Sequence, residues 1–389
     1  MSNSNHWSKE ETADFSYTFL AWYEREKRTL PWRENKDPYR IWVSEIMLQQ
    51  TRVDTVIPYF LNFMTLFPTI KALAEAPEDT LLKAWEGLGY YSRVRNLQKS
   101  AIQIMEDFDG KMPQTAAEIS TLKGIGPYTT GAIASMAYGL PTPAVDGNVM
   151  RVVSRLFEIT DDIAKPKSRK IFEETMQDII SRDNPGDFNQ AMMDLGSSTC
   201  TPKNPSCNLC PVNEFCQSYE KGTVGNYPVK SKKVKAKPVY YVGMIIKNEK
   251  GEFLLEKRPT EGLLANMWTF PLFPEEMMTH EVEVPAGGLH EIASEQTQQI
   301  VLKQLQEAMT QKYQLHPTFM KRPLPEIKHI FTHLKWFIAC YYGQVDQVKL
   351  TDLPENCEFV HPENFEKYTF PGPQQKMLAQ YQKNIGQKK

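Results

Sequence analysis

The chain has 389 residues, of which 41% are hydrophobic and 24% are charged, the proportions of an ordinary globular protein. This length allows two domains, each with its own core. The formal net charge of −2 argues against nucleic-acid binding by bulk electrostatics, so any DNA contact must depend on local patches and backbone amides. No run approaches the ~20 apolar residues of a membrane span, and the polar first residues do not form a signal peptide. We therefore expect a cytoplasmic protein without membrane contact.

The N-terminal part of the chain favours helices. Aromatic residues at helical spacing predict a packing helix over residues 8–28, and the proline that follows predicts a short extended segment at 30–33. Residues 41–53 are expected to form one helix. Prolines and glycines separate further short helices, expected at 56–67, 70–74, 79–85, 93–107 and 116–121.

One acidic residue interrupts the apolar run of the 41–53 helix. Glu45 lies within the sequence IWVSEIML, in which every other residue except a serine is apolar. Such a Glu either faces solvent or occupies an apolar pocket. An unperturbed Glu is only about 0.2% protonated at pH 7, whereas a pocket that raised its pKa to ~6 would give roughly 10% protonation. A residue that acts as a general acid needs such a pocket.

The stretch 122–151 contains two adjoining motifs, LKGIGPYTTGAI and PAVDGNV. In the first, Gly124 and Gly126 predict a tight hairpin before a helix that begins at Pro127. Backbone N–H groups there would point at an anion such as phosphate, although a lone Gly-x-Gly is as typical of an ordinary helix–helix turn. The second motif places Asp146 beside a flexible glycine just before another apolar helix.

Four of the six cysteines are clustered with the spacing C-x6-C-x2-C-x5-C. They are Cys200, Cys207, Cys210 and Cys216. In a reducing compartment this favours metal ligation over disulfides. Zinc sites usually contain two CxxC-like pairs and this segment has one, so zinc and free thiols are the weaker alternatives.

A basic linker is expected at 221–238, which carries six lysines and no acidic residue. It is either a solvated tether or a segment that also follows the DNA backbone. A β-rich domain should follow at 239–375, with a hairpin, a helix at 291–314 and a strand pair at 327–345. Residues 376–389 are expected to be a tail.

Several of these segments together resemble the helix-hairpin-helix DNA glycosylases, and among them the MutY-type adenine DNA glycosylases. The segments are SEIMLQQT, GLGYYSRVRNL, LKGIGPYTTGAI, VDGNV and the cysteine spacing. The resemblance implies a mainly α catalytic domain over residues 1–220 that holds a 4Fe–4S cluster on the four cysteines. It also implies an α/β Nudix-like C-terminal domain. The stretch around 304–307 lacks the REUxEE metal-binding pattern of Nudix hydrolases, so we expect recognition and no hydrolase activity there.

The resemblance also implies a mechanism, in which Glu45 protonates N7 of a flipped adenine and Asp146 stabilises the oxocarbenium cation. Tyr128 and Asn148 would support them by hydrogen bonding. In the related endonuclease III branch a lysine occupies the position of Tyr128 and forms a Schiff base. A tyrosine cannot do so, and the chain is therefore expected to be a monofunctional glycosylase.

Further residues are expected to bind the substrate. The set comprises Trp32, Arg33, Leu48 and Gln190 around the adenine; Gln50, Thr51, Leu88 and Tyr90 near the duplex; and Phe331, Thr332 and His333 at the opposite base. The last three resemble the family's HxFSH loop, with Thr in place of the usual Ser, and His333 is alternatively a structural strand histidine. Backbone amides of Gly124 and Gly126 would hold a phosphate.

The expected partner is double-stranded DNA with adenine opposite 8-oxoguanine or guanine, bound by a monomer associated with the nucleoid. Two other functions remain open at this stage. One is a bifunctional lyase of the endonuclease III class, against which Tyr128 and the second domain argue. The other is a non-enzymatic iron–sulfur DNA sensor, which would not need Glu45 and Asp146 together.

Overall fold

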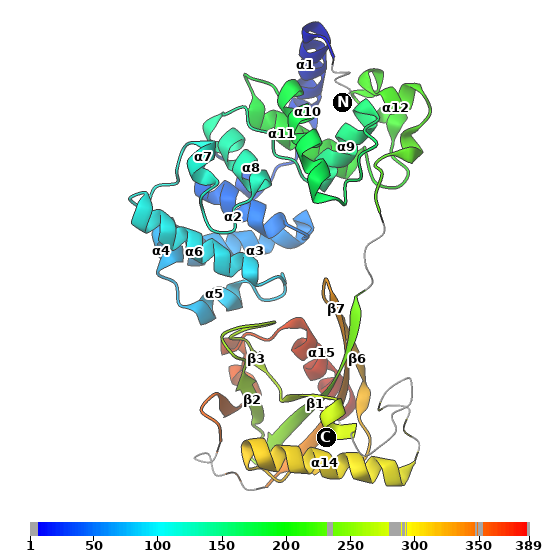
Figure 1. Cartoon of the computed structure of the whole chain (residues 1–389). Helices are drawn as coiled ribbons and strands as arrows, with labels where there is room; N and C mark the ends of the chain where they lie inside the picture. Colours follow the sequence, from blue (N-terminus) through cyan, green and yellow to red (C-terminus); the bar gives the residue numbers. More distant parts are fainter. Residues whose placement is uncertain are drawn as a thin grey trace. The chain divides into compact units, whose positions relative to one another are not determined.

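The computed structural model describes residues 7–231, 236–279, 289, 292, 294–346, 348 and 353–386 (Figure 1). The chain divides into two compact units. The first contains residues 1–76 and 92–232, and the second contains 77–91 and 233–389. No helix within the described ranges is long and apolar enough to cross a membrane.

The first unit is helical, as predicted. Its elements are α1 (Lys9–Glu26), η1 (Pro31–Arg33), α2 (Pro38–Leu48), α3 (Val53–Leu66), α4 (Ile70–Ala74), α6 (Ser92–Asp107), α7 (Ala116–Ile119), α8 (Pro127–Tyr138), α9 (Gly147–Phe157), η2 (Pro166–Ser168), α10 (Arg169–Ile179), α11 (Pro185–Ser198), η3 (Cys207–Leu209), η4 (Asn213–Phe215), α12 (Gln217–Glu220) and η5 (Val224–Asn226).

The single helix predicted at 41–53 is wrong, because α2 ends at Leu48 and α3 begins at Val53. Between them Gln50 has a φ of 60°, which stops the helix. The guanidinium of Arg93 on α6 donates hydrogen bonds to the last carbonyls of α2, including that of Gln49 at 2.6 Å. The segment at 30–33 is not extended either; it forms one 3-10 turn that buries Trp32.

The core of the first unit joins α1, α9, α10 and α11. Phe15 and Phe19 of α1 stack on each other and meet Phe188 of α11 edge to face. Gly196 lets α11 approach the start of α9 closely, since a Cβ there would lie 2.7 Å from the Cβ of Asn148. This packing fixes the N-terminal end of α9, where Asp146 lies.

The described residues of the second unit form an eight-stranded sheet with the strand order β3-β2-β1-β7-β5, to which β4, β6 and β8 add as further partners of β1, β7 and β2. The strands are β1 (Lys237–Asn248), β2 (Phe253–Lys257), β3 (Trp268–Thr269), β4 (Leu272–Pro274), β5 (Thr318–Phe319), β6 (Leu324–Ile330), β7 (Leu334–Val345) and β8 (Cys357–Val360). The other elements are α5 (Glu78–Ala84), α13 (Glu276–Thr279), α14 (Glu295–Tyr313), η8 (Pro362–Lys367), α15 (Gly372–Tyr381) and η9 (Gln382–Gly386). The central strands β1 and β7 are parallel and all other pairs are antiparallel.

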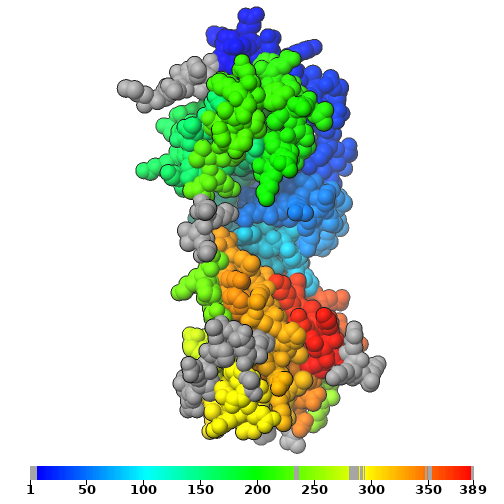
Figure 2. Space-filling model, turned by 90° about the vertical axis from the view of Figure 1, so that its right-hand side faces the viewer, coloured from blue at the N-terminus to red at the C-terminus, as the bar shows by residue number. Residues whose placement is uncertain are grey.

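Both faces of the sheet are covered, which explains the continuous burial along β1. Val242, Met244 and Ile246 belong to the core beneath α14, whereas Ile245 belongs to the core beneath α15. Alternate side chains of one strand thus serve two cores. Figure 2 shows the outer side of α14 in yellow at the surface of this unit.

Two boundaries differ from the sequence prediction. Residues 77–91 belong to the second unit, where Asp79 pairs with Lys257 at 3.0 Å and Glu86 accepts a hydrogen bond from Phe370 N at 2.6 Å. The expected tail from 376 onward is instead the continuation of α15, with Met377 buried. Residues 387–389 of that tail lie outside the described part of the chain.

The predicted linker is anchored in its first half. Lys221 pairs with Glu158 at 2.6 Å, and Ile163 N donates to the carbonyl of Val229 at 3.0 Å. Residues 221–231 therefore lie on the first unit. Residues 232–235 are outside the described residues, and so are 291 and 293 at the start of the helix predicted at 291–314.

Candidate functional site

A cavity of about 1230 Å³ in the first unit lies between η1, α2, α8, α9 and α11. Ten of the predicted site residues line it, although they span more than 150 positions of the sequence. They are Trp32, Arg33, Glu45, Leu48, Gln50, Thr51, Tyr128, Asp146, Asn148 and Gln190. The cavity therefore gathers the predicted catalytic residues with the predicted adenine-binding residues.

Glu45 is buried on α2, so the solvent-facing alternative does not hold. The hydroxyl of Tyr128 on α8 donates a hydrogen bond of 2.5 Å to Glu45 Oε2. Burial raises the pKa of Glu45 to about 7. The hydrogen bond from Tyr128 and the charge of Arg33 oppose this rise, and the charge of Asp146 adds to it. A substantial fraction of Glu45 is therefore protonated at neutral pH.

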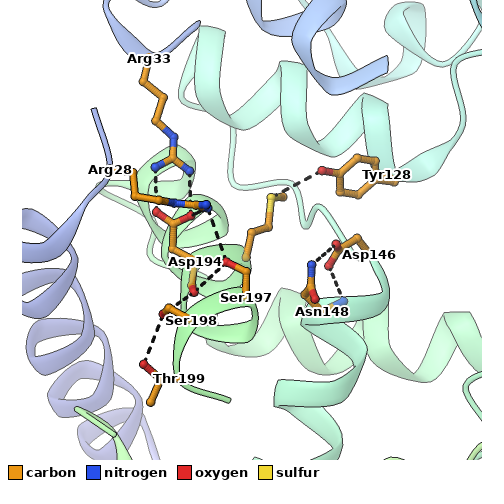
Figure 3. Close-up of polar contacts among 10 residues, drawn as sticks. Arg28, Arg33, Tyr128, Asp146, Asn148, Asp194, Ser197, Ser198 and Thr199 are labelled. Carbon is orange, nitrogen blue, oxygen red and sulfur yellow. Dashed lines mark hydrogen bonds and ion pairs between the residues drawn. The ribbon is translucent and has the colours of Figure 1, made fainter. Parts of the chain in front are cut away.

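Asp146 is the N-cap of α9 and lies beside its first turn (Figure 3). Its Oδ1 accepts the backbone N–H groups of Asn148 and Val149, each at 2.8 Å, and its Oδ2 accepts the Asn148 side-chain amide at 2.9 Å. Burial raises the pKa of Asp146, while these hydrogen bonds and Arg151 favour the carboxylate. The helix start thus fixes the direction in which this carboxyl group faces.

Arg151 orients the side chain of Asn148 through a hydrogen bond. The Arg151 guanidinium donates from Nη2 to Asn148 Oδ1 at 2.8 Å and to the carbonyl of Gly196 at 2.6 Å. Its Nε donates to the carbonyl of Cys200 at 2.8 Å. The orientation of the Asp146 side chain therefore depends on contacts between α9 and α11.

A second charged group lies at the side of the cavity formed by η1 and α11 (Figure 3). Arg33 donates two hydrogen bonds to Asp194, at 2.7 and 3.1 Å. Arg28 donates to Asp194 Oδ1 as well. Asp194 is buried, and its Arg28 partner is the most exposed of the three side chains.

Sequence reasoning missed Arg28, Asp194 and Arg151 as parts of the site. Asp194 lies in the segment FNQAMMDLG, where it is the single acidic residue, and this charge between apolar neighbours was the available indication. Arg28 lies two positions before the LPWR motif in a charged run, so its sequence context gave no such indication. Nothing local identifies their partners, since Arg28 and Asp194 are separated by 166 positions.

The predicted hairpin is present before α8. Gly124 has a φ of +73°, and a Cβ there would lie 2.7 Å from Asn96 Cβ, so both the backbone conformation and the space require glycine. Gly126 is the N-cap of α8, and both glycines are exposed. The geometry is suited to an anion at the helix start, and phosphate binding there stays a prediction.

The four clustered cysteines line one cavity with mostly apolar walls. All four are free thiols, and Arg155 Nη1 donates to Cys200 Sγ at 3.2 Å. Four sulfur donors around a shared space, with a guanidinium directed at one of them, fit an anionic iron–sulfur cluster.

The remaining predicted residues lie in the second unit. Leu88 is buried, whereas Tyr90 is 47% exposed with a φ of 48°. Thr332 Oγ1 donates to the Tyr90 hydroxyl at 3.2 Å, which brings together two residues predicted to read the duplex. Thr332 and His333 are exposed in the turn between β6 and β7, and Phe331 packs edge to face on Trp336.

Three family models match successive parts of the chain. Residues 43–178 match the family model of the HhH-GPD superfamily base excision DNA repair proteins. Residues 200–216 match the iron-sulfur binding domain of endonuclease III, and residues 241–380 match the NUDIX domain.

Whole-chain relatives have one description in common. The adenine DNA glycosylase of Homo sapiens is 33% identical over 96% of this chain and 74% of its own length. That of Schizosaccharomyces pombe is 31% identical over 88% of this chain and 86% of its own. Among solved structures, a thermostable thymine-DNA glycosylase is 27% identical, with a TM-score of 0.50 over 55% of this chain and 98% of its own.

Proposed function

The chain belongs to the adenine DNA glycosylases of base excision repair, and from this premise we propose that it removes adenine mispaired with 8-oxoguanine and, less efficiently, with guanine. The observation that carries the proposal is the meeting of Glu45, Tyr128 and Asp146 in one cavity. That cavity is large enough for a base taken out of the stack. We expect the enzyme to act as a monomer on chromosomal DNA.

Glu45 acts as the general acid in this proposal. Its raised pKa lets it carry a proton at neutral pH, and transfer of that proton to N7 of the flipped adenine makes the base a better leaving group. The Tyr128 hydroxyl keeps the carboxyl group oriented. Burial raises the pKa of Tyr128 well above its usual value, so Tyr128 stays a neutral donor.

Asp146 faces the sugar. As the bond between adenine and C1′ breaks, positive charge develops on the deoxyribose ring, and a carboxylate held in place stabilises it or bonds to it transiently. Three hydrogen bonds hold Asp146 in one orientation before the reaction starts. Asn148 contributes one of them through its side chain and supports the attacking water.

The base would lie among Trp32, Arg33, Leu48 and Gln190. Recognition of the opposite base falls to Tyr90 and to the turn Phe331-Thr332-His333, where a ring can enter the stack and polar groups can read a base edge. Gln50 and Thr51 of the first unit and Leu88 of the second unit stay predicted substrate-binding residues. We assign recognition and no hydrolysis to the second unit, because the stretch 304–307 on α14 lacks the REUxEE metal-binding pattern.

For the cysteine site we propose a 4Fe–4S cluster held by Cys200, Cys207, Cys210 and Cys216. Such a cluster would order the loop between α11 and α12, and no reaction step is assigned to it. Purified protein should be brown and contain about four irons per chain. One zinc and no iron would refute this assignment.

The test of the main proposal is single-turnover excision from duplexes that carry adenine opposite 8-oxoguanine, guanine or thymine. Excision should be fastest opposite 8-oxoguanine and slow opposite thymine. Product strands should break only after hot alkali, because Tyr128 cannot form a Schiff base. Strand cleavage at neutral pH that borohydride traps would move the protein to the lyase class.

The recognition turn needs its own variant. Phe331→Ala with His333→Ala should lower the preference for 8-oxoguanine over guanine by roughly 10- to 100-fold, because each lost contact is worth about 1–3 kcal/mol. Excision opposite guanine should persist. A folded double variant with its full preference would show that His333 and Phe331 do not read the opposite base.

A further inference from the structure

The cluster of Arg28, Asp194 and Arg33 brings two guanidinium groups to one buried carboxylate. The exposed fractions of the side chains are 42% for Arg28, 7% for Asp194 and 15% for Arg33. Asp194 therefore lies between two arginines, of which Arg28 is the more exposed, and all three residues line the proposed adenine cavity (Figure 3). The carbonyl oxygen of Asp194 also accepts the hydroxyls of Ser197 and Ser198, at 3.1 and 2.8 Å.

The ionisation of the cluster is set by its internal contacts. Burial opposes ionisation of Asp194, but the hydrogen bonds and charges of Arg33 and Arg28 outweigh it and lower the pKa of Asp194. Burial likewise opposes the charged form of Arg33, and Asp194 outweighs that effect and raises the Arg33 pKa. Both partners are therefore charged at neutral pH.

The positive charge of Arg33 also acts on Glu45, the proposed general acid. Besides burial, the pKa of Glu45 depends on Arg33, on the Tyr128 hydroxyl of α8 and on the Asp146 carboxyl group at the start of α9. A positive charge near a carboxyl group favours the carboxylate. Arg33 would thus draw the proton off Glu45 if no anion offset its charge.

We propose that Asp194 is a positioning residue that holds the Arg33 guanidinium against the adenine cavity and offsets its positive charge, so that Glu45 keeps its proton. The proposal rests on the function assigned to Glu45 above. Asp194 itself touches neither the base nor the sugar in this scheme. It acts through Arg33, and Arg28 sets the remaining charge of the group from the solvent side.

The charges around Asp194 and Arg33 determine whether loss of the Asp194 charge raises or lowers the pKa of Glu45. On α1, Tyr23 lies beneath Arg33, with the guanidinium carbon 5.9 Å from the ring centre, and burial raises its pKa so that it stays neutral. The three-residue group carries a net charge of +1, from two guanidinium groups and one carboxylate. Loss of the Asp194 charge makes it +2 and should favour the Glu45 carboxylate.

The test is the pH dependence of single-turnover excision, measured with the full-length, cluster-containing protein from pH 5.5 to 9. In Asp194→Asn the excision rate should begin to decline at a pH that is lower by ~1 unit than in the wild type. This is the low end of the pKa shift that a close charge produces. Excision should then fall about tenfold at pH 8 and far less at pH 6. A purely structural role would lower the rate by the same factor at every pH.

Variants that restore the net charge of the Arg28, Asp194 and Arg33 group provide a second test. Asp194→Asn combined with Arg28→Gln restores the net charge of +1 and should return the decline toward its wild-type position. Arg28→Gln alone reduces the net charge to zero and should move the decline upward by a smaller amount, since Arg28 is partly solvated. This variant tests the proposal even if Asp194→Asn does not fold.

The surface control is Glu174→Gln, which removes the exposed partner of Lys170 on α10 and should leave the pH profile unchanged. Parallel profiles for all Asp194 and Arg28 variants would overturn the proposal. Full activity of Glu45→Gln would instead overturn the function assigned to Glu45. The two failures are therefore distinguishable.

Discussion

Two carboxyl groups face the same cavity, but they differ in the number and kind of hydrogen bonds that they receive. Glu45 lies within a helix among apolar side chains and receives one hydrogen bond, from Tyr128. Asp146 caps a helix and receives three hydrogen bonds, two of them from backbone N–H groups. Burial raises both pKa values, but only at Asp146 does the surrounding structure supply several donors that favour the charged form.

The difference assigns the two functions. A carboxyl group with few donors keeps its proton near neutral pH and can donate it, whereas a carboxylate at a helix start is stabilised as an anion. In the proposed reaction one carboxyl group therefore acts as an acid and the other as a stabilising anion, and their different positions on their helices distinguish them. Each prediction below tests one side of this comparison.

The largest effect is expected for Asp146→Asn. Asparagine is also a good N-cap, so α9 should keep its start, while the negative charge that faces the developing cation is lost. Single-turnover excision should fall by about a thousandfold or more with little change in affinity for the mispair. The control is Asp107→Asn at the exposed end of α6, and near-normal excision by the Asp146 variant would remove Asp146 from the mechanism.

The second effect concerns pH. Because the protonated form of Glu45 is the working form, the excision rate should be level below its pKa of about 7 and fall roughly tenfold per unit above it. Protonation of Asp146 should cause a separate decline at acidic pH. An excision rate that stays level from pH 6 to 9 would contradict the assignment of Glu45 as the acid.

The third effect is on stability. The pKa of Glu45 is raised in the folded protein, so the stability associated with its neutral form is present at low pH and is lost as pH rises through about 7. Glu45→Gln removes this loss. The quantity to compare is the free energy of unfolding of the variant minus that of the wild type. This difference should be about 2 kcal/mol larger at pH 8 than at pH 5. Denaturant unfolding at both pH values checks this, and a constant difference would contradict it.

The smallest effect tests how Asp146 is held. In Gly196→Ala the new Cβ would press on Asn148, which donates to Asp146. Excision should fall about tenfold, since a displaced catalytic group loses part of its advantage. Gly225→Ala is the matched control, because a Cβ there meets nothing within 4 Å. Equal rates for the two variants would show that this close packing does not orient Asp146.

The sequence predicts local features of this molecule well. The hairpin at Gly124 and the helix start after Asp146 are specified by glycine, proline and capping residues within a few positions. The hairpin between β1 and β2 follows from the same kind of local pattern. The apolar neighbours of Glu45 alone left its burial open, and the resemblance of SEIMLQQT to the family segment favoured the pocket.

Features set by distant contacts could not be predicted. The helix that contains Glu45 ends at Leu48, just before the positive φ of Gln50, and Arg93 of α6 binds the carbonyl groups at this end. No pattern within 41–53 reveals that distant partner. The same holds for Asp194, whose two arginine partners precede it by more than 160 positions. Residues 77–91 follow a first-unit helix in the chain, yet Asp79 pairs with Lys257 and Glu86 accepts a hydrogen bond from Phe370 N in the second unit.

The pairing of β1 with β7 has a consequence for biosynthesis. The strands run parallel over twelve residues each, and their partners, such as Lys237 and Leu334, are about a hundred positions apart. During translation the central strand is therefore complete long before its main neighbour exists, and its edge stays available to other chains. A message that ends before residue 345 would yield a second unit without its centre, and such a product is expected to aggregate or be degraded.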